Sequence, residues 1–139
     1  DMVALTRELI PAEYPVHALG IGHPPYITRC YAMGYGLFDS AMPTRDARHG
    51  RLYVFKHIPT RDEATRGDDW FGYVYADEKR SIKSNAPAEE SCDCPLCSRY
   101  SLGYLRHLFK LNDALYHRLA SLHNLRFMAR LMTLLRREN

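Results

Sequence analysis

Residues 15–39 read PVHALGIGHPPYITRCYAMGYGLFD, and this stretch decides the fold. Its first eight residues form a short apolar run that ends in a glycine turn, which indicates a buried strand. The two prolines that follow can open a helix, since proline is tolerated in a first helical turn, and a glycine at 34 ends it. Residues 35–38 predict a second short strand, which ends at Asp39. Strand, helix and strand in this order are typical of a parallel α/β fold.

The flanking segments continue as a mixture of helices, strands and polar connections. The expected elements are a helix over 2–10, a polar loop over 40–50, a strand over 51–55, an irregular charged segment over 56–70, a strand of alternating aromatic residues over 71–75 and a polar loop over 79–91. From residue 100 onward, leucines recur at helical spacing and predict helices with an interruption at His123-Asn124. Such a stripe is more typical of a packed core than of a cofactor site.

The composition is close to the average for globular proteins. The chain has 139 residues, of which 46% are apolar and 25% charged, and this excludes a disordered tail, a collagen-like fibre and a bare coiled coil. No run of eighteen apolar residues occurs, so we expect no transmembrane helix. The first residues lack the layout of a signal peptide, and we expect a cytoplasmic protein.

The formal net charge is +3, and the basic excess lies late in the chain. After residue 98 only Asp113 and Glu138 oppose a set of eight basic residues. These are Arg99, Arg106, Lys110, Arg118, Arg126, Arg130, Arg136 and Arg137. A basic segment suits a polyanionic partner, and a solvated helix face explains it about equally well.

Three of the four cysteines, Cys92, Cys94 and Cys97, lie within six positions. An odd cluster of this kind indicates a metal site in a reducing compartment rather than a disulfide framework. Tight turns can bring three such thiolates onto one ion, and a closed tetrahedral zinc site needs a fourth ligand. Spacing alone leaves His107, His117 and His123 as candidates.

Asp39 lies directly after the second expected strand. In parallel α/β barrels, catalytic groups gather at this end of the strands. The next segment carries Arg45, Arg48 and His49, and a carboxylate beside cations stays ionised and can act as a nucleophile. A turn-capping role ahead of Pro43 explains Asp39 as well, and on pattern alone it is slightly favoured.

Five blocks of sequence stand out in a fixed order. They are LGIG (19–22), FDSAMPTRDARHG (38–50), CDCPLC (92–97), YSLGYLRHLF (100–109) and HNL (123–125). Together they resemble the tRNA-guanine transglycosylase family, which exchanges a guanine in nucleic acid for a 7-deazaguanine base. The family fold is a (β/α)₈ TIM barrel with an inserted zinc-binding subdomain and C-terminal helices, and the resemblance implies the C-terminal part of that fold here.

The resemblance also assigns roles to individual residues. It implies that Asp39 is the catalytic nucleophile, which attacks the ribose and holds a covalent intermediate. Leu19 and Gly20 match the segment that lines the base pocket, although Leu19 replaces a commoner Met. Arg45 and Arg48 match residues that contact the nucleic acid. Cys92, Cys94, Cys97 and His123 match the ligands of a structural Zn²⁺ ion, which selects His123 among the three histidines.

The resemblance covers only about the last third of the family's length. It implies that residues 1–55 are the last βα units of the barrel with the nucleophile loop, 56–99 a zinc-binding subdomain with an extended loop, and 100–139 the helices that complete the zinc site. A missing N-terminal region or a second polypeptide would then complete the barrel and supply the general acid/base. We expect a homo- or hetero-oligomer with tRNA and a deazaguanine base as partners.

Two alternatives remain open at this level. The same chemistry could act on DNA, because residues 15–24 look like archaeal members whereas 43–45 look like bacterial and eukaryotic ones. The chain could instead be a non-catalytic nucleic-acid-binding subunit or fragment. Residues 56–80 look longer than the family's usual connection, and a surface insertion is favoured over a substrate contact through Arg61, Arg66, Trp70, Lys79 and Arg80.

Overall fold

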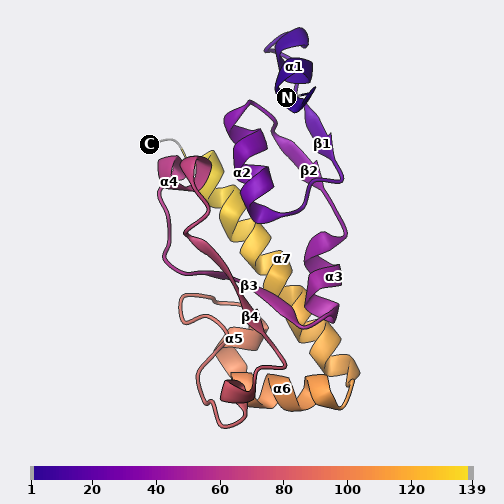
Figure 1. Cartoon of the computed structure of the whole chain (residues 1–139), viewed down its shortest axis with the longest axis vertical. Helices are drawn as coiled ribbons and strands as arrows, with labels where there is room; N and C mark the ends of the chain where they lie inside the picture. Colours follow the sequence, from indigo (N-terminus) through magenta and orange to yellow (C-terminus); the bar gives the residue numbers. More distant parts are fainter. Residues whose placement is uncertain (1, 138–139) are drawn as a thin grey trace.

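Helix α7 (Ala114–Arg136) runs along most of the molecule and packs against α2, α3, α5, α6 and β3 (Figure 1). The structure, a computed structural model, describes residues 2–137. The helix begins where the Asp113 side chain accepts a hydrogen bond from the Leu115 N–H at 2.7 Å. The expected interruption at His123-Asn124 is wrong, because the helix continues through both residues and buries them completely.

The N-terminal part confirms the predicted order of helix, strand, helix and strand. It contains α1 (Met2–Leu9), β1 (His17–Leu19), α2 (Pro24–Ala32) and β2 (Leu37–Asp39). The two strands are parallel, with Leu19 opposite Asp39. One face of this small sheet buries Ala18 and Cys30 of the covering helix, whereas His17 and Leu19 on the other face are exposed. The fold of residues 2–137 is therefore mixed α/β, and these residues form no closed barrel.

Residues 40–50 are not a loop, as their polarity suggested, but contain helix α3 (Met42–Arg48). Pro43 stands in the first turn, where its missing N–H costs nothing. The helix buries Pro43, Asp46 and Ala47 and leaves Arg45 and Arg48 exposed. Its buried face packs on α7, so tertiary contact stabilises a segment whose composition alone is that of a turn.

Strands β3 (Arg51–Phe55) and β4 (Phe71–Tyr75) confirm the two strands expected here, and the structure pairs them antiparallel. The segment between them is more ordered than expected, because it contains helix α4 (Arg61–Arg66). The Thr60 hydroxyl accepts from the Glu63 N–H and the Glu63 carboxylate accepts from the Thr60 N–H, which forms a capping box. Trp70 is buried against Phe55 and is therefore a core residue.

The remaining elements form the end of the molecule opposite α1 (Figure 1). They are the short 3₁₀ helix η1 (Lys79–Ser81), α5 (Pro95–Arg99) and α6 (Leu102–Lys110). Leu96, Leu105 and Leu108 pack with Leu119 of α7 in a core that also includes Ala47 of α3 and Leu52 of β3. No helix among residues 2–137 is long and apolar enough to cross a membrane.

Candidate functional site

The carboxyl ends of β1 and β2 bring Asp39 beside Leu19 and Gly20. Asp39 Oδ1 accepts a hydrogen bond from the Gly20 N–H at 3.1 Å and lies 3.0 Å from His17 Nε2. The side chain of Asp39 is 60% exposed, and Leu19 is 76% exposed. The arrangement presents a carboxylate, an apolar side chain and a glycine backbone together to the solvent.

The backbone at Gly20 explains why a glycine follows β1. Its φ is +74°, in the left-handed region that other residues rarely adopt. This turn directs the Gly20 N–H toward Asp39, so the glycine serves the geometry of the carboxylate as well as the turn.

A cleft of about 410 Å³ opens beside Asp39 between β2, α3 and α7. Apolar side chains line most of it, including Phe38, Met128 and Met132. Asp39 and Ser40 are its polar lining residues. Arg45 and Arg48 follow on the exposed face of the adjacent α3. The described structure thus places a carboxylate beside an apolar recess, with two exposed cations on the helix that follows.

The three clustered cysteines and His123 form a candidate metal site. All four ligand atoms lie within 4.8 Å of one another. His123 Nδ1 is 3.4 Å from the sulfurs of Cys94 and Cys97 and 3.8 Å from that of Cys92. Tetrahedral zinc with Zn–S and Zn–N bonds of ordinary length separates sulfur and nitrogen by roughly 3.5 Å. The donor set and its spacing therefore fit one tetrahedral ion.

Local structure prepares the thiols for such an ion. Cys94 is the N-cap of α5, and its sulfur accepts from the Cys97 N–H at 3.4 Å. Hydrogen bonds from Cys92 and Cys97 lower the pKa of the Cys94 thiol, and a metal ligand must be a thiolate. Cys92 and Cys94 are buried, while Cys97 is partly exposed.

The remaining nitrogen of His123 fixes the orientation of the ring. His123 Nε2 donates to the Tyr53 carbonyl at 2.8 Å, so Nδ1 carries the lone pair that faces the cysteines. His107 is exposed, and His117 Nε2 pairs with the Asn112 side chain at 3.1 Å. Of the three histidines that spacing left open, only His123 joins the cysteines.

Asn124, the next residue of α7, binds the same strand. Its Oδ1 accepts from the Tyr53 N–H at 2.9 Å, and its Nδ2 donates to the Arg51 and Pro43 carbonyls at 3.0 and 2.9 Å. Consecutive residues of one helix therefore hold both backbone groups of Tyr53. The pattern of residues does not show this role, because a polar pair inside an apolar stripe indicates a helix break.

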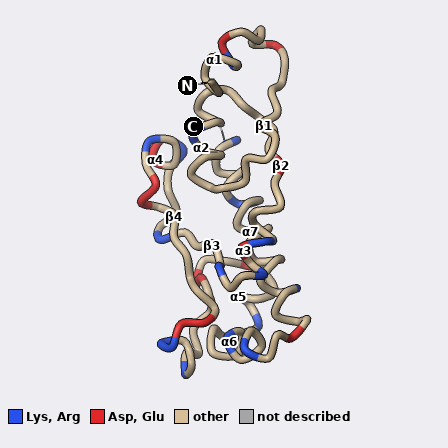
Figure 2. The backbone as a smooth tube through the Cα atoms, turned by 45° about the vertical axis from the view of Figure 1, so that its right-hand side comes forward, with Lys and Arg blue, Asp and Glu red and all other residues tan. Residues whose placement is uncertain are grey.

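The basic excess of the C-terminal segment is partly neutralised by acids that precede it. Arg126 makes two hydrogen bonds to Asp93, at 2.6 and 2.7 Å, and Arg130 binds the buried Glu89 at 2.5 Å. Lys110 and its neighbour Arg106 face Asp77, and the hydrogen bond from Lys110 lowers the pKa of that carboxyl. Lys and Arg are spread along the whole molecule, on several elements (Figure 2). The late excess thus serves packing as well as surface charge.

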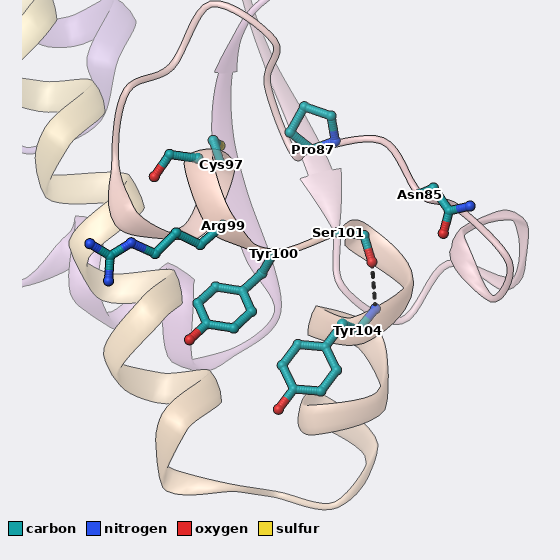
Figure 3. Close-up of a pocket in the computed structure, with 8 residues that line it drawn as sticks. Asn85, Pro87, Cys97, Arg99, Tyr100, Ser101 and Tyr104 are labelled. Atoms are coloured by element: carbon teal, nitrogen blue, oxygen red, sulfur yellow. Dashed lines mark hydrogen bonds between the residues drawn. The ribbon is translucent and has the colours of Figure 1, made fainter.

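A second hollow lies against the candidate metal site. Figure 3 shows Tyr100 and Tyr104 side by side on its wall, with Ser101 Oγ accepting from the Tyr104 N–H at 3.2 Å. The two rings are stacked, with centroids 5.5 Å apart. Cys97 also lines this hollow of about 520 Å³, so one side of the candidate metal site lies close to the surface.

The fold and the two sites define an α/β protein with a strand-end carboxylate and a Cys₃His candidate metal centre. Residues 1–138 match the family described as Queuine tRNA-ribosyltransferase. The chain belongs to this family, as the sequence blocks predicted.

Individual relatives support the assignment. The chain is 35% identical over 136 residues to the Queuine tRNA-ribosyltransferase of Thermoanaerobacter pseudethanolicus, a match that covers 98% of this chain and 32% of the relative. It is 36% identical over 133 residues to the protein of the same name from Helicobacter pylori strain P12, covering 95% of this chain and 32% of the relative. The chain therefore spans about a third of the length of the curated relatives it matches.

Proposed function

We propose that this chain is the nucleophile-bearing and metal-binding portion of an enzyme that replaces guanine in tRNA by a 7-deazaguanine base. The observation that carries the proposal is Asp39, held by two hydrogen bonds at the carboxyl ends of parallel strands and open to solvent. Membership of the family supports the substrate class, since the relatives are named for queuine and tRNA.

The proposed reaction consists of two displacements at one carbon. A carboxylate oxygen of Asp39 attacks the ribose anomeric carbon, and the electron pair of the glycosidic bond leaves with guanine, which takes a proton from a general acid outside this chain. The incoming base then loses a proton, attacks the same carbon and releases Asp39. Two inversions retain the configuration, as in retaining glycosidases.

The neighbours of Asp39 would bind the substrate. Leu19 presents an exposed apolar side chain one strand away, which suits the face of a purine. Gly20 allows close approach of the base because no atom lies within 4 Å of the position a Cβ would take. Arg45 and Arg48 on α3 would contact the phosphates next to the exchanged nucleotide.

The metal in this proposal is a structural Zn²⁺ held by Cys92, Cys94, Cys97 and His123. Four protein ligands fill a tetrahedron and leave no position for a reacting water. The ion would join the 92–97 loop to α7. The chain would then divide into the last barrel units (1–55), the zinc subdomain (56–99) and the closing helices (100–139).

Barrel segments from a preceding region or another polypeptide would complete the active site. An eight-stranded barrel typically needs about 250 residues. The free side of β2 and the apolar cleft beside it suit such segments. An oligomer in the cytoplasm is part of the same proposal.

Trapping of the covalent intermediate tests this function. The protein, assembled with the segments that complete the barrel, is incubated with tRNA and the denatured complex is separated on a gel. We expect an adduct with the parent protein and with Asp69→Asn, a change at an exposed carboxylate, and none with Asp39→Ala. An adduct that survives Asp39→Ala would remove the nucleophile role.

The choice of nucleic acid is tested separately. Labelled deazaguanine is offered together with tRNA or with duplex DNA of matched concentration. We expect incorporation into tRNA, and incorporation into DNA alone would favour the DNA-modifying alternative.

A further inference from the structure

The two oxygens of Asp39 lie in different environments. Oδ1 receives both hydrogen bonds, from the Gly20 N–H at 3.1 Å and from His17 Nε2 at 3.0 Å. Among residues 2–137, none is within hydrogen-bonding geometry of Oδ2. A carboxylate can only accept hydrogen bonds, so the His17 tautomer that stabilises this contact carries its hydrogen on Nε2. The protein therefore holds one oxygen and leaves the other free.

The strand register explains how His17 reaches Asp39. Leu19 lies opposite Asp39, and His17 lies two residues earlier on the same exposed face of β1. Diagonal neighbours on a sheet face are within reach of long side chains, and the imidazole is long enough to span this diagonal. Within residues 2–137, the contact with Asp39 is the one hydrogen bond that the His17 ring makes.

We propose that His17 is a positioning residue that fixes Asp39 Oδ1 so that Oδ2 is the attacking oxygen. This inference rests on the proposed function, because it requires Asp39 to be the nucleophile. The Gly20 N–H, in the turn directly after β1, supplies the second donor, and the two donors together hold the carboxylate in a single orientation. Orientation of a reacting group is a recognised source of rate enhancement.

The same hydrogen bond affects the two displacements differently. When Oδ2 bonds to the anomeric carbon, Oδ1 becomes the carbonyl oxygen of an ester and loses most of its negative charge. When the incoming base attacks, the Oδ2–carbon bond breaks and its electron pair returns to the carboxylate. Donors on Oδ1 stabilise the returning charge, because hydrogen bonds to charged acceptors are stronger than those to neutral ones. His17 therefore assists chiefly the release of Asp39.

Substitution of His17 tests this role. We expect His17→Leu to slow breakdown of the covalent adduct by about tenfold, the usual effect of one hydrogen bond to a charged group. The adduct should then accumulate relative to turnover, and kcat should fall more than KM rises. His17→Gln, which can keep an N–H near the position of Nε2, should restore most of the breakdown rate.

His57→Leu, at an exposed histidine that follows β3, is the matched control and should leave both steps unchanged. The unfolding midpoint of each variant separates a positioning role from damage to the fold. If the adduct forms and depends on Asp39 but breaks down at the parent rate in His17→Leu, this inference is wrong and the proposed function stands. If the parent protein forms no adduct, the proposed function itself fails.

Discussion

The strand-end site and the metal site are built in opposite ways. Asp39 is 60% exposed and is held by groups that lie only 19 and 22 residues away, on the neighbouring strand and in the turn that follows it. His123 is fully buried, and its ring contacts cysteines and a carbonyl that lie 26 to 70 residues away. The strand-end carboxylate is thus open to solvent and held locally, whereas His123 is buried and joins segments that are distant in the sequence.

This difference predicts that substitutions in the candidate metal site change the stability of the fold, whereas substitution of Asp39 does not. The candidate metal site connects the 92–97 loop, β3 and α7, so we expect its loss to affect several elements at once. Asp39 is an exposed residue at the end of a small sheet, so we expect its substitution to change the stability of the fold little. Variants in the candidate metal site should therefore lower Tm, whereas Asp39 variants should lower the rate of base exchange without a change in Tm.

The largest effect on stability is expected at the metal ligands. Cys94→Ala should reduce bound zinc from about one ion per chain to nearly none, and should lower Tm by about 10 °C or more. Cys30→Ala is the control, since this cysteine lies among Val16 and Ala18 and outside the cluster. Metal analysis and thermal unfolding measure both quantities. Full zinc content in Cys94→Ala would exclude the proposed site.

Asp39→Asn should show the reverse pattern. Its Tm should stay within about 2 °C of the parent value, because substitutions at exposed positions are usually near neutral. Base exchange should fall by roughly 10⁴-fold or more, as expected when a nucleophile is lost. A large drop in Tm with Asp39→Asn would show that the two sites are not separated in this way.

Alanine variants of His107, His117 and His123 test which histidine binds the metal. His123→Ala should weaken zinc binding and destabilise α7, because it removes a ligand and leaves the buried Tyr53 carbonyl without its donor. His107→Ala and His117→Ala should leave zinc content unchanged. Competition with a chelator measures the affinity, and equal affinities for all three variants would contradict the ligand assignment.

A variant of Asn124 tests the contact of α7 with β3 and α3 independently of metal binding. Asn124→Leu removes three hydrogen bonds and leaves the Tyr53 N–H unpaired, so we expect a loss of about 2–3 kcal/mol in the free energy of unfolding. The control is Ser121→Ala, at a polar residue one turn earlier on α7. Urea unfolding gives the free energy, and zinc should remain bound.

The smallest effects are expected at the exposed arginines of α3. Arg45→Ala and Arg48→Ala should each weaken binding to tRNA and reduce the slope of log affinity against log salt by about one. Arg118→Ala, at an exposed arginine of α7 away from Asp39, should change neither. Equal slopes for all variants would place the nucleic acid elsewhere.

Local patterns predicted the regular elements best. The strand, helix and strand of residues 15–39 and the alternation in 71–75 were correct because each depends on neighbouring residues. Helix α3 was missed because its polar residues indicated a turn, although Pro43 stands where a helix can begin. Helix α4 was missed although Thr60 and Glu63 have the spacing of a capping box.

The sites depend on contacts that no local pattern contains. Three cysteines in six positions indicated a metal, but the choice among three histidines required either the family resemblance or the fold. Asn124 looked like a helix break because a buried amide is unfavourable until its partners on α3 and β3 are known. The pairing of His17 with Asp39 follows only from the register of two strands.

The position of His123 has a topological consequence. With an ion bound, Cys97 and His123 would close a ring of chain that contains α6 and the turn at Asn112, whose φ is +52°. A single backbone cut within this ring would leave both pieces tied to the same ion, in the way that a disulfide ties a nicked protein. The metal would then make the connection between α5 and α7 independent of the peptide chain that joins them.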